Sequence, residues 1–369
     1  MQFIFYAFLC FSFIQFCFYL GIFRAFSFAK KPTKNNEQQN IPVSVIICAH
    51  NEAENLKEFL PFFINQEYEN FELLLINDAS NDETLDVMGS FKQLHPTKIS
   101  IVDVVPNEQF WRNKKYALSL GIKSAKYEHL LFSDADCKPV SNQWISEITS
   151  KFTEQKSIVL GYGAYEKINN SWLNKLIRFE TLFTAIQYFS YTKIGLPYMG
   201  VGRNLAYTKS LFFESSGFAN HMHIRSGDDD LFVNKNATNQ NISLSYFTDS
   251  FTLSKPKATF KEWIHQKKRH TTTASHYKPI HKILLGVFYS SQLLFWLLVI
   301  LLLATTFQWK IVVGVLLLRS ISQYLIIGAS AKKLNEKDLV LWAPILEIFL
   351  IFMQLFIFIK NIIAKPTHW

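Results

Sequence analysis

The chain has 369 residues, of which 49% are hydrophobic, and a formal net charge of +9. Its apolar fraction, with 35 Phe, is high for a soluble protein, and no nucleic-acid-binding motif accompanies the positive charge. The 4 Cys show no disulfide framework, which is consistent with a reducing compartment.

The first segment of the chain is apolar. Residues 1–23 carry no charged side chain and are long enough to cross the hydrocarbon core of a bilayer. A secretory signal is the alternative, but no basic region precedes the apolar run and no small-residue cleavage site follows it. We therefore predict a retained transmembrane anchor at 1–23 and a basic linker at 24–41.

Strand and helix patterns alternate in the next part of the chain. Aliphatic runs at 41–51, 71–80, 98–105 and 127–137 have the composition of buried strands, and residues 52–66 and 82–94 have that of helices. This alternation predicts an α/β domain at 42–254. Its parallel sheet would be covered on both faces and would bind ligands at the carboxyl ends of its strands.

Polar residues follow three of the predicted strands. They are His50, Asn51 and Glu52, then Asn77, Asp78, Ser80 and Asp82, and finally Asp134 and Asp136. Each alone is most often a helix N-cap or a turn residue, but together they predict a site at one edge of the sheet. Asp134 and Asp136 would repel each other unless a cation or a proton lies between them.

The C-terminal third is basic and then apolar. Residues 255–282 contain eight Lys or Arg and one acid, Glu262, and 283–363 hold three segments long enough to span a bilayer. By the positive-inside rule the domain faces the cytosol from the cell (inner) membrane. Pro344 and Glu347 leave an interfacial last helix as an alternative to a full crossing, so the number of crossings before the tail at 364–369 stays open.

Four motifs occur in the order found in the family 2 glycosyltransferases, which are inverting enzymes with the nucleotide-binding GT-A fold. "VSVIICAHNEAENL", "INDASNDET", "NKKYALSLGI" and "SDADC" resemble that family's motifs, and the resemblance runs from about Val43 to His270. It implies a mixed, mainly parallel sheet and a Mg²⁺ or Mn²⁺ ion on Asp136. Asp134 would lie nearer the ribose or the water shell of the metal. The nucleotide-binding residues that it implies are His50, Asn51, Glu52, Asp78, Lys114, Asp134 and Arg269.

The segment "RSGDDDLFV" resembles the part of the family that carries the catalytic base. Inversion needs a base that accepts the proton of the acceptor hydroxyl. The resemblance implies Asp228 in this role, but Gly227 replaces the family's Glu, so Asp229 stays an alternative. A solvated acidic turn that caps a helix is the structural alternative. The resemblance also implies contacts with the acceptor from Gly202, Asn204, Asp230 and Gln266.

The basic segment at 255–282 has two interpretations. "WIHQKKRH" resembles the family's Gln-x-x-Arg-Trp element, which implies that Arg269 binds the diphosphate, although His270 replaces the Trp. That replacement argues against processive synthesis of a long polymer. The same segment could be an amphipathic helix on anionic lipid, with Phe260, Trp263 and Ile264 towards the membrane.

The sequence thus predicts a membrane-bound inverting glycosyltransferase. Its expected donor is a nucleotide sugar with UDP as the nucleotide, and its expected acceptor is a lipid, a lipid-linked group or a glycan at the bilayer. The alternatives are a processive polysaccharide synthase and, from another class, an inactive membrane scaffold or a transport component. No nucleic acid is expected as a partner.

Overall fold

A computed structural model describes residues 1–30, 40–105, 113–224 and 226–363. The chain forms two compact units. A helical unit takes in Met1–Lys30, Ile168–Leu196 and residues 257–363, and a sheet unit takes in the described residues of 40–167 and Pro197–Pro256. Most of the predicted linker, residues 31–39, and the tail at 364–369 lie outside the described residues.

The sheet unit is built on a seven-stranded sheet of order β3-β2-β1-β4-β8-β6-β9. Its strands are β1 (Val43–Ala49), β2 (Phe71–Asn77), β3 (Ile99–Asp103), β4 (His129–Asp134), β6 (Ile158–Leu160), β8 (Leu205–Thr208) and β9 (Ile242–Leu244). The first four pair in parallel, whereas β8 runs antiparallel to both β4 and β6. The mixed, mainly parallel sheet is therefore confirmed. Strands β5 (Cys137–Pro139), β7 (Gly163–Tyr165) and β10 (Thr252–Ser254) form a second sheet.

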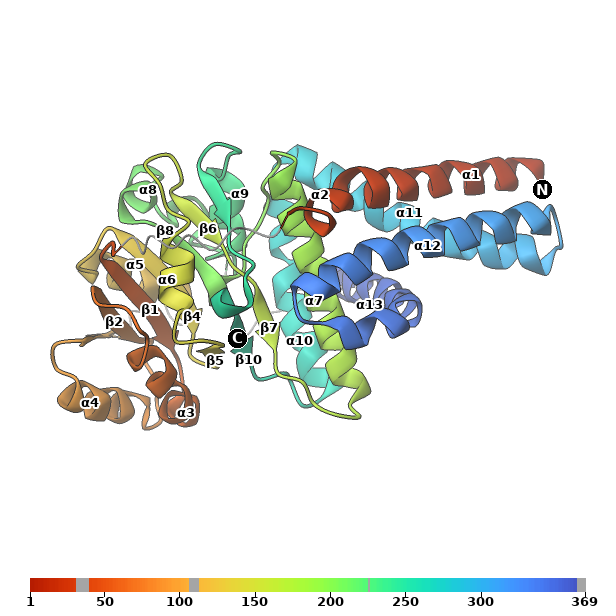
Figure 1. Cartoon of the computed structure of the whole chain (residues 1–369). Helices are drawn as coiled ribbons and strands as arrows, with labels where there is room; N and C mark the ends of the chain where they lie inside the picture. Colours follow the sequence, from red (N-terminus) through yellow and green to blue (C-terminus); the bar gives the residue numbers. More distant parts are fainter. Residues whose placement is uncertain (31–39, 106–112, 225, 364–369) are drawn as a thin grey trace. The chain divides into compact units, whose positions relative to one another are not determined.

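Helices cover the large sheet (Figure 1). They are α3 (Ala53–Ile64), α4 (Thr84–Leu94), α5 (Lys114–Ser124), α6 (Trp144–Thr149), α8 (Lys209–Glu214) and α9 (Asp230–Asn236). The central strands are buried along nearly their whole length, which explains their continuous aliphatic sequences. Leu60 and Phe63 of α3 and Trp144 of α6 join these strands in one core. Single 3₁₀ turns lie at Gly202–Asn204, Ala219–His221 and Thr248–Ser250.

Within the described residues, four helical segments of the helical unit are long and apolar enough to cross a membrane: Gln2–Ser27, Pro279–Ala304, Trp309–Lys333 and Lys337–Asn361. The first is continuous through α1 (Gln2–Phe16), the π-helical η1 (Cys17–Phe23) and α2 (Arg24–Ser27). The next two are α11 (Pro279–Ala304) and α12 (Trp309–Lys333), and the last begins with a 3₁₀ turn (Lys337–Trp342) before α13 (Ala343–Ile363). The predicted apolar segments are thus confirmed as helices.

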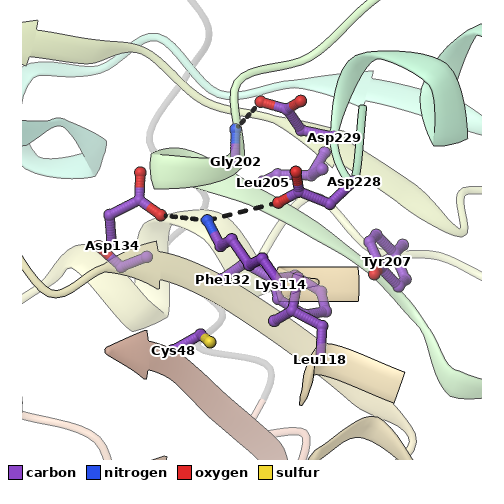
Figure 2. A pocket seen from close by; sticks show the side chains of 11 residues that line it. Cys48, Lys114, Leu118, Phe132, Asp134, Gly202, Leu205, Tyr207, Asp228 and Asp229 are labelled. Atoms are coloured by element: carbon purple, nitrogen blue, oxygen red, sulfur yellow. Dashed lines mark hydrogen bonds and ion pairs between the residues drawn. The ribbon is translucent and has the colours of Figure 1, made fainter. Parts of the chain in front are cut away.

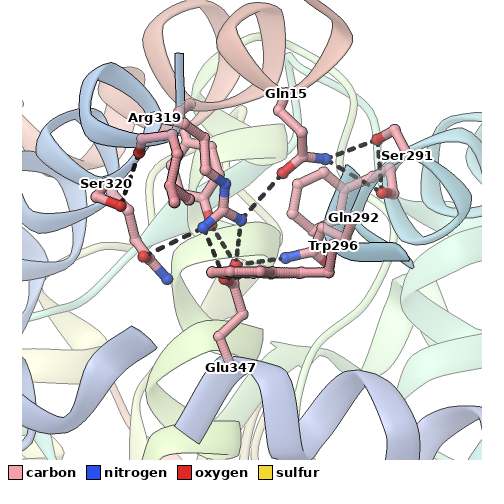
Figure 3. A network of polar contacts seen from close by, with 11 residues as sticks. Gln15, Ser291, Gln292, Trp296, Arg319, Ser320 and Glu347 are labelled. Atoms are coloured by element: carbon pink, nitrogen blue, oxygen red, sulfur yellow. Dashed lines mark hydrogen bonds and ion pairs between the residues drawn. The ribbon is translucent and has the colours of Figure 1, made fainter. Parts of the chain in front are cut away.

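A buried ion pair connects these helices (Figure 3). Arg319 of α12 donates to both carboxylate oxygens of Glu347 of α13, at 2.6 and 2.7 Å, and Arg319 is fully buried. Gln15 of α1 accepts from the same guanidinium at 3.2 Å, and Gln292 of α11 donates to Glu347 at 2.7 Å. Charged groups this deep among apolar helices need such partners, so the network defines how the helices pack.

Two further helices belong to the helical unit: α7 (Trp172–Lys193) and α10 (Phe260–Thr271), with a 3₁₀ turn at Thr273–His276 after α10. Arg178 of α7 pairs with Glu336, before α13, and Glu180 pairs with Lys267 of α10 at 2.5 Å. Trp263 of α10 is fully buried, so the expectation that its side chain faces the membrane is wrong.

Candidate functional site

The loops after β1 and β2 lie together at the carboxyl edge of the sheet. His50 Nδ1 donates to the carbonyl oxygen of Asp78 at 2.6 Å, and the amide of Asn51 donates to Ser80 Oγ at 3.1 Å. The amide of Glu52 donates to Thr84 Oγ1 at 2.9 Å. Burial raises the pKa of Asp78, whereas nearby His50 and Lys114 lower it. The structure therefore brings together the predicted nucleotide-binding residues of these two loops.

Strand β4 brings Asp134 to the same edge, where its Cα pairs with that of Cys48 in β1. Lys114, at the start of α5, places Nζ 2.8 Å from Asp134 Oδ1 and 3.4 Å from Asp228 Oδ2 (Figure 2). Burial would lower the pKa of Lys114, but the two carboxylates raise it well above its usual value. Lys114 is therefore a positive group shared by Asp134 and Asp228.

These residues line one pocket in the sheet unit. Its lining comes from β1, α5, β4, β8 and the turns before β8 and α9, and consists of Cys48, Lys114, Leu118, Phe132, Ser133, Asp134, Gly202, Leu205, Tyr207, Asp228 and Asp229. Apolar side chains form part of the wall, and the charged groups converge from separate elements (Figure 2). This combination is typical of a binding site for a small polar ligand.

Asp228 and Asp229 differ in their surroundings. The two carboxylate oxygens of Asp229 accept from the backbone amides of Gly202 and Asp230, each at 2.7 Å, and Asp229 caps α9. Burial, with Asp228 and Asp230 nearby, raises the pKa of Asp229 to about 8. Asp228 instead lies against Lys114 with its side chain 15% exposed. Asp230, the third acid, is 8% exposed and accepts from the amide of Leu231.

The turn before these acids requires glycine. Gly227 has a φ of +97°, and a Cβ there would lie 2.5 Å from a side-chain carbon of Leu231. A non-glycine residue at this position would be strained both by its backbone conformation and by this contact. Gly227, which stands where the family has Glu, therefore fits the backbone conformation of this turn.

Asp134 and Asp136 can form part of a metal site with Cys137, since ligand atoms of the three residues lie within 4.8 Å of one another. Asp136 follows the end of β4 in a turn. Burial raises the pKa of the Cys137 thiol, which also lies 2.9 Å from Ser254 Oγ. Carboxylates are the ligands that hard divalent cations prefer, whereas a protonated thiol is a poor one. The two Asp residues therefore fit Mg²⁺ or Mn²⁺ better than the thiol does.

Asn204, predicted to contact the acceptor, has its side chain fully buried. Its Nδ2 donates to the carbonyl oxygens of Tyr162 and Ser250, at 2.9 and 2.7 Å, and its Oδ1 accepts from Trp144 Nε1 at 3.1 Å. Both donors and the oxygen are therefore used within the protein, so the structure does not support a direct contact with a sugar. Asn204 instead ties the β8 turn to three other segments.

The neighbouring Arg203 was not predicted. Its guanidinium lies over the ring of Tyr165, 4.3 Å from the centroid, and donates to the carbonyl oxygen of Gly163 at 2.6 Å. Asp136 is one of the groups that raise the pKa of Arg203, although burial opposes them. Arg203 is thus a positive group near the candidate metal site. Arg203 lies between Gly202 and Asn204, which were predicted to contact the acceptor, and no sequence pattern singled it out.

Lys115, next to Lys114 in sequence, was also missed. Its side chain is buried, and Nζ donates to the carbonyl oxygens of His221 and Ile224 at 2.8 and 2.6 Å. Burial lowers the pKa of Lys115 to about 8, although the nearby carboxylates of Asp228, Asp230 and Asp229 act to raise it. Lys115 therefore holds the segment that leads to Asp228.

Replacing Lys115 with Met is expected to lower the free energy of unfolding by about 2 kcal/mol or more, because two carbonyl oxygens lose their shared donor. The rate of sugar transfer should fall too, since the segment that carries Asp228 loosens. Chemical unfolding and a transfer assay measure the two effects. Lys123→Met, at an exposed position of the same helix, is the control. Unchanged stability in Lys115→Met would contradict the role assigned to Lys115.

Gln266 and Arg269 lie on α10 in the helical unit, whereas all of the pocket residues belong to the sheet unit. Burial lowers the pKa of Arg269. The contacts predicted for these two residues, with the acceptor and with the diphosphate, stay predictions.

Comparison with known proteins relates this chain to glycosyltransferases. Residues 44–218 match the family model described as glycosyl transferase family 2. A poly-beta-1,6-N-acetyl-D-glucosamine synthase of Staphylococcus epidermidis is 36% identical over 103 residues, which are 28% of this chain and 24% of that protein. An uncharacterized glycosyltransferase of Haemophilus influenzae is 34% identical over 131 residues, 35% of this chain and 38% of that protein. The alignments thus span less than half of either relative.

Among solved structures, a mannosyltransferase from Pyrobaculum calidifontis in complex with GDP-Man and Mn²⁺ is similar to this chain with a TM-score of 0.57. It is 18% identical, and the match covers 88% of this chain and 98% of the other. At this identity the likeness establishes the fold. The chain therefore carries a family 2 glycosyltransferase domain with the GT-A fold, flanked by helices that are long and apolar enough to span a membrane.

Proposed function

We propose that the protein transfers a sugar from a nucleotide-sugar donor to a membrane-associated acceptor, with inversion at the anomeric carbon. The main support is the position of Lys114 between Asp134 and Asp228 in the pocket of a family 2 domain. In this arrangement Asp134 would lie towards the donor and Asp228 towards the acceptor. A UDP-sugar is the proposed donor. A lipid, lipid-linked or glycan molecule is the proposed acceptor, in the cell (inner) membrane with the site in the cytosol.

The donor end of the pocket would be built by the loops after β1, β2 and β4. His50, Asn51, Glu52 and Asp78 would contact the nucleoside. A Mg²⁺ or Mn²⁺ ion held by Asp134 and Asp136 would neutralise negative charge on the leaving diphosphate. Lys114 and Arg203 are positive groups near these carboxylates and could bind phosphate oxygens in the same region.

At the acceptor end, Asp228 is the proposed base. It faces the pocket beside Lys114, whereas both oxygens of Asp229 accept from backbone amides. A general base needs a free oxygen towards the acceptor hydroxyl, and Asp228 meets this condition better. Lys114 Nζ, 3.4 Å from Asp228 Oδ2, places a positive charge beside this carboxylate.

A processive polysaccharide synthase is the second candidate. It is favoured by the match of 103 residues to relatives named poly-beta-1,6-N-acetyl-D-glucosamine synthase. It is opposed by His270, which replaces the Trp of the Gln-x-x-Arg-Trp element. The size distribution of the products separates a single transfer from chain elongation.

The test of the proposed function is a panel of nucleotide sugars offered to the detergent-solubilised full chain with Mg²⁺ or Mn²⁺. We expect one donor to release its nucleotide faster than the others and only when the metal is present. Release that EDTA does not reduce would contradict the metal site. Failure to bind or cleave any donor, with the chain folded, would favour an inactive scaffold.

A further inference from the structure

The helical unit contains an apolar groove between α10 and α13. Its lining consists of Ile264, Ile345, Ile348, Phe349, Phe352, Met353 and Phe356. Its volume is about 530 Å³, which lies within the range of ligand sites, ~300–1,000 Å³. Phe352 and Phe356 are 45% and 47% exposed, so large rings lie open in the groove. An apolar surface of this kind marks a contact with a protein, a ligand or a membrane.

Positive side chains gather at one end of this groove. Lys360 of α13 places Nζ 5.6 Å from the ring centroid of Phe356. The adjacent Asn361 donates to the backbone carbonyl oxygen of Lys268 at 3.2 Å, which places the backbone of Lys268 in α10 near the same end. Lys268 follows Ile264 by four residues and therefore shares its face of the helix. Lys267 differs, because it already pairs with Glu180.

We infer that this groove binds a phospholipid with an anionic headgroup, with one acyl chain along the apolar lining and the phosphate beside Lys268 and Lys360. An apolar chain joined to a negative group matches an apolar groove that ends in two cations. Most of the groove lining lies on α13, which belongs to a segment apolar enough to span a bilayer. In a bilayer this surface would contact lipid. The inference does not rest on the proposed sugar transfer.

The test uses the full chain in detergent and counts retained lipids by native mass spectrometry. Dioleoyl phosphatidylglycerol is compared with dioleoyl phosphatidylcholine, which has the same chains and a zwitterionic headgroup. We expect one phosphatidylglycerol molecule to be retained at least about tenfold more strongly, since each lysine near an anionic surface contributes on the order of 1 kcal/mol. Equal retention of the two lipids would overturn the inference, as would a groove occupied by a second copy of the chain.

Variants separate the contact with the lipid headgroup from the contact with the acyl chain. The double variant Lys268→Gln, Lys360→Gln should lose the preference for phosphatidylglycerol, and Lys268→Arg, Lys360→Arg should keep it. Lys310→Gln is the matched control, because Lys310 also lies over a ring, that of Trp309, but outside the groove. Retained phosphatidylcholine in the double variant verifies that the groove is folded. An unchanged preference in the Gln variant would refute the headgroup contact.

A second pair of variants tests the apolar lining. Ile345→Trp would fill part of the groove and should reduce retention of both lipids by severalfold. Leu318→Trp is its control, since Leu318 is 58% exposed on α12 and Ile345 is 55% exposed. If the two variants retain the lipids equally, the acyl chain of the lipid does not occupy the groove. Thermal unfolding in the same detergent verifies that both variants are folded.

Discussion

Replacing Asp228 with Asn is expected to lower the rate of sugar transfer about 10²-fold or more while nucleotide and metal binding persist. The amide cannot accept the proton of the acceptor hydroxyl, but it has nearly the same size and can still contact Lys114. The fall should therefore appear in kcat with little change in the dissociation constant of the nucleotide. Single-turnover transfer and calorimetric nucleotide binding measure the two quantities.

Two controls accompany this variant. Asp86→Asn, at an exposed position of α4, should leave transfer unchanged. Asp229→Asn should destabilise the turn, because its amide nitrogen would face one of the two backbone donors that now meet oxygen atoms. If Asp228→Asn stays active and a folded Asp229→Asn loses all transfer, the base is Asp229.

Replacing Asp136 with Asn is expected to abolish metal-dependent nucleotide binding and to lower transfer by at least 10²-fold, since a divalent cation supplies several kcal/mol of charge stabilisation. The fold should persist, because Asp136 lies half-buried in the turn after β4. Titration of Mn²⁺ at a fixed nucleotide concentration measures the effect. If nucleotide binding depends on Mn²⁺ equally in the variant and in the original chain, Asp136 is not a ligand of the metal.

Asp134→Asn is the informative comparison for Asp136. It removes a possible metal ligand and also the 2.8 Å ion pair with Lys114. We therefore expect the weaker metal dependence to be accompanied by a change in nucleotide affinity without metal. Such a change should be absent in Asp136→Asn, where the side chain of Asp136 accepts from the Cys137 thiol at 3.2 Å.

Much of the sheet unit could be predicted because its signals are local. Aliphatic runs indicate buried strands, and the parallel sheet then brings their carboxyl ends together, which groups Asp78 with Asp134. The roles of Lys114 and Lys115 could not be separated in this way. Successive helical residues point about 100° apart, so one lysine reaches the pocket and the other reaches the loop at His221. The contact that gives Lys115 its structural role is with His221, 106 residues later in the sequence.

Non-local contacts also explain the features that the sequence did not reveal. Helix α7 lies between strands in the sequence, yet its Arg178 pairs with Glu336, 158 residues later. Asn204 belongs to a motif associated with the acceptor, but its three partners come from segments at Trp144, Tyr162 and Ser250. Neither pairing leaves a periodic or compositional pattern, so only the folded chain shows it.

The ion pair between Arg319 and Glu347 has a consequence for biosynthesis. Its carboxylate is on the last apolar helix, and Gln15, which completes the contacts of the guanidinium, is on the first. During translation Arg319 enters the bilayer before its counter-ion exists, and a lone charge there is costly. The helices can therefore reach their final packing in the membrane only after Glu347 has been made. A nascent chain that stops before Glu347 would leave the guanidinium of Arg319 without its carboxylate partner.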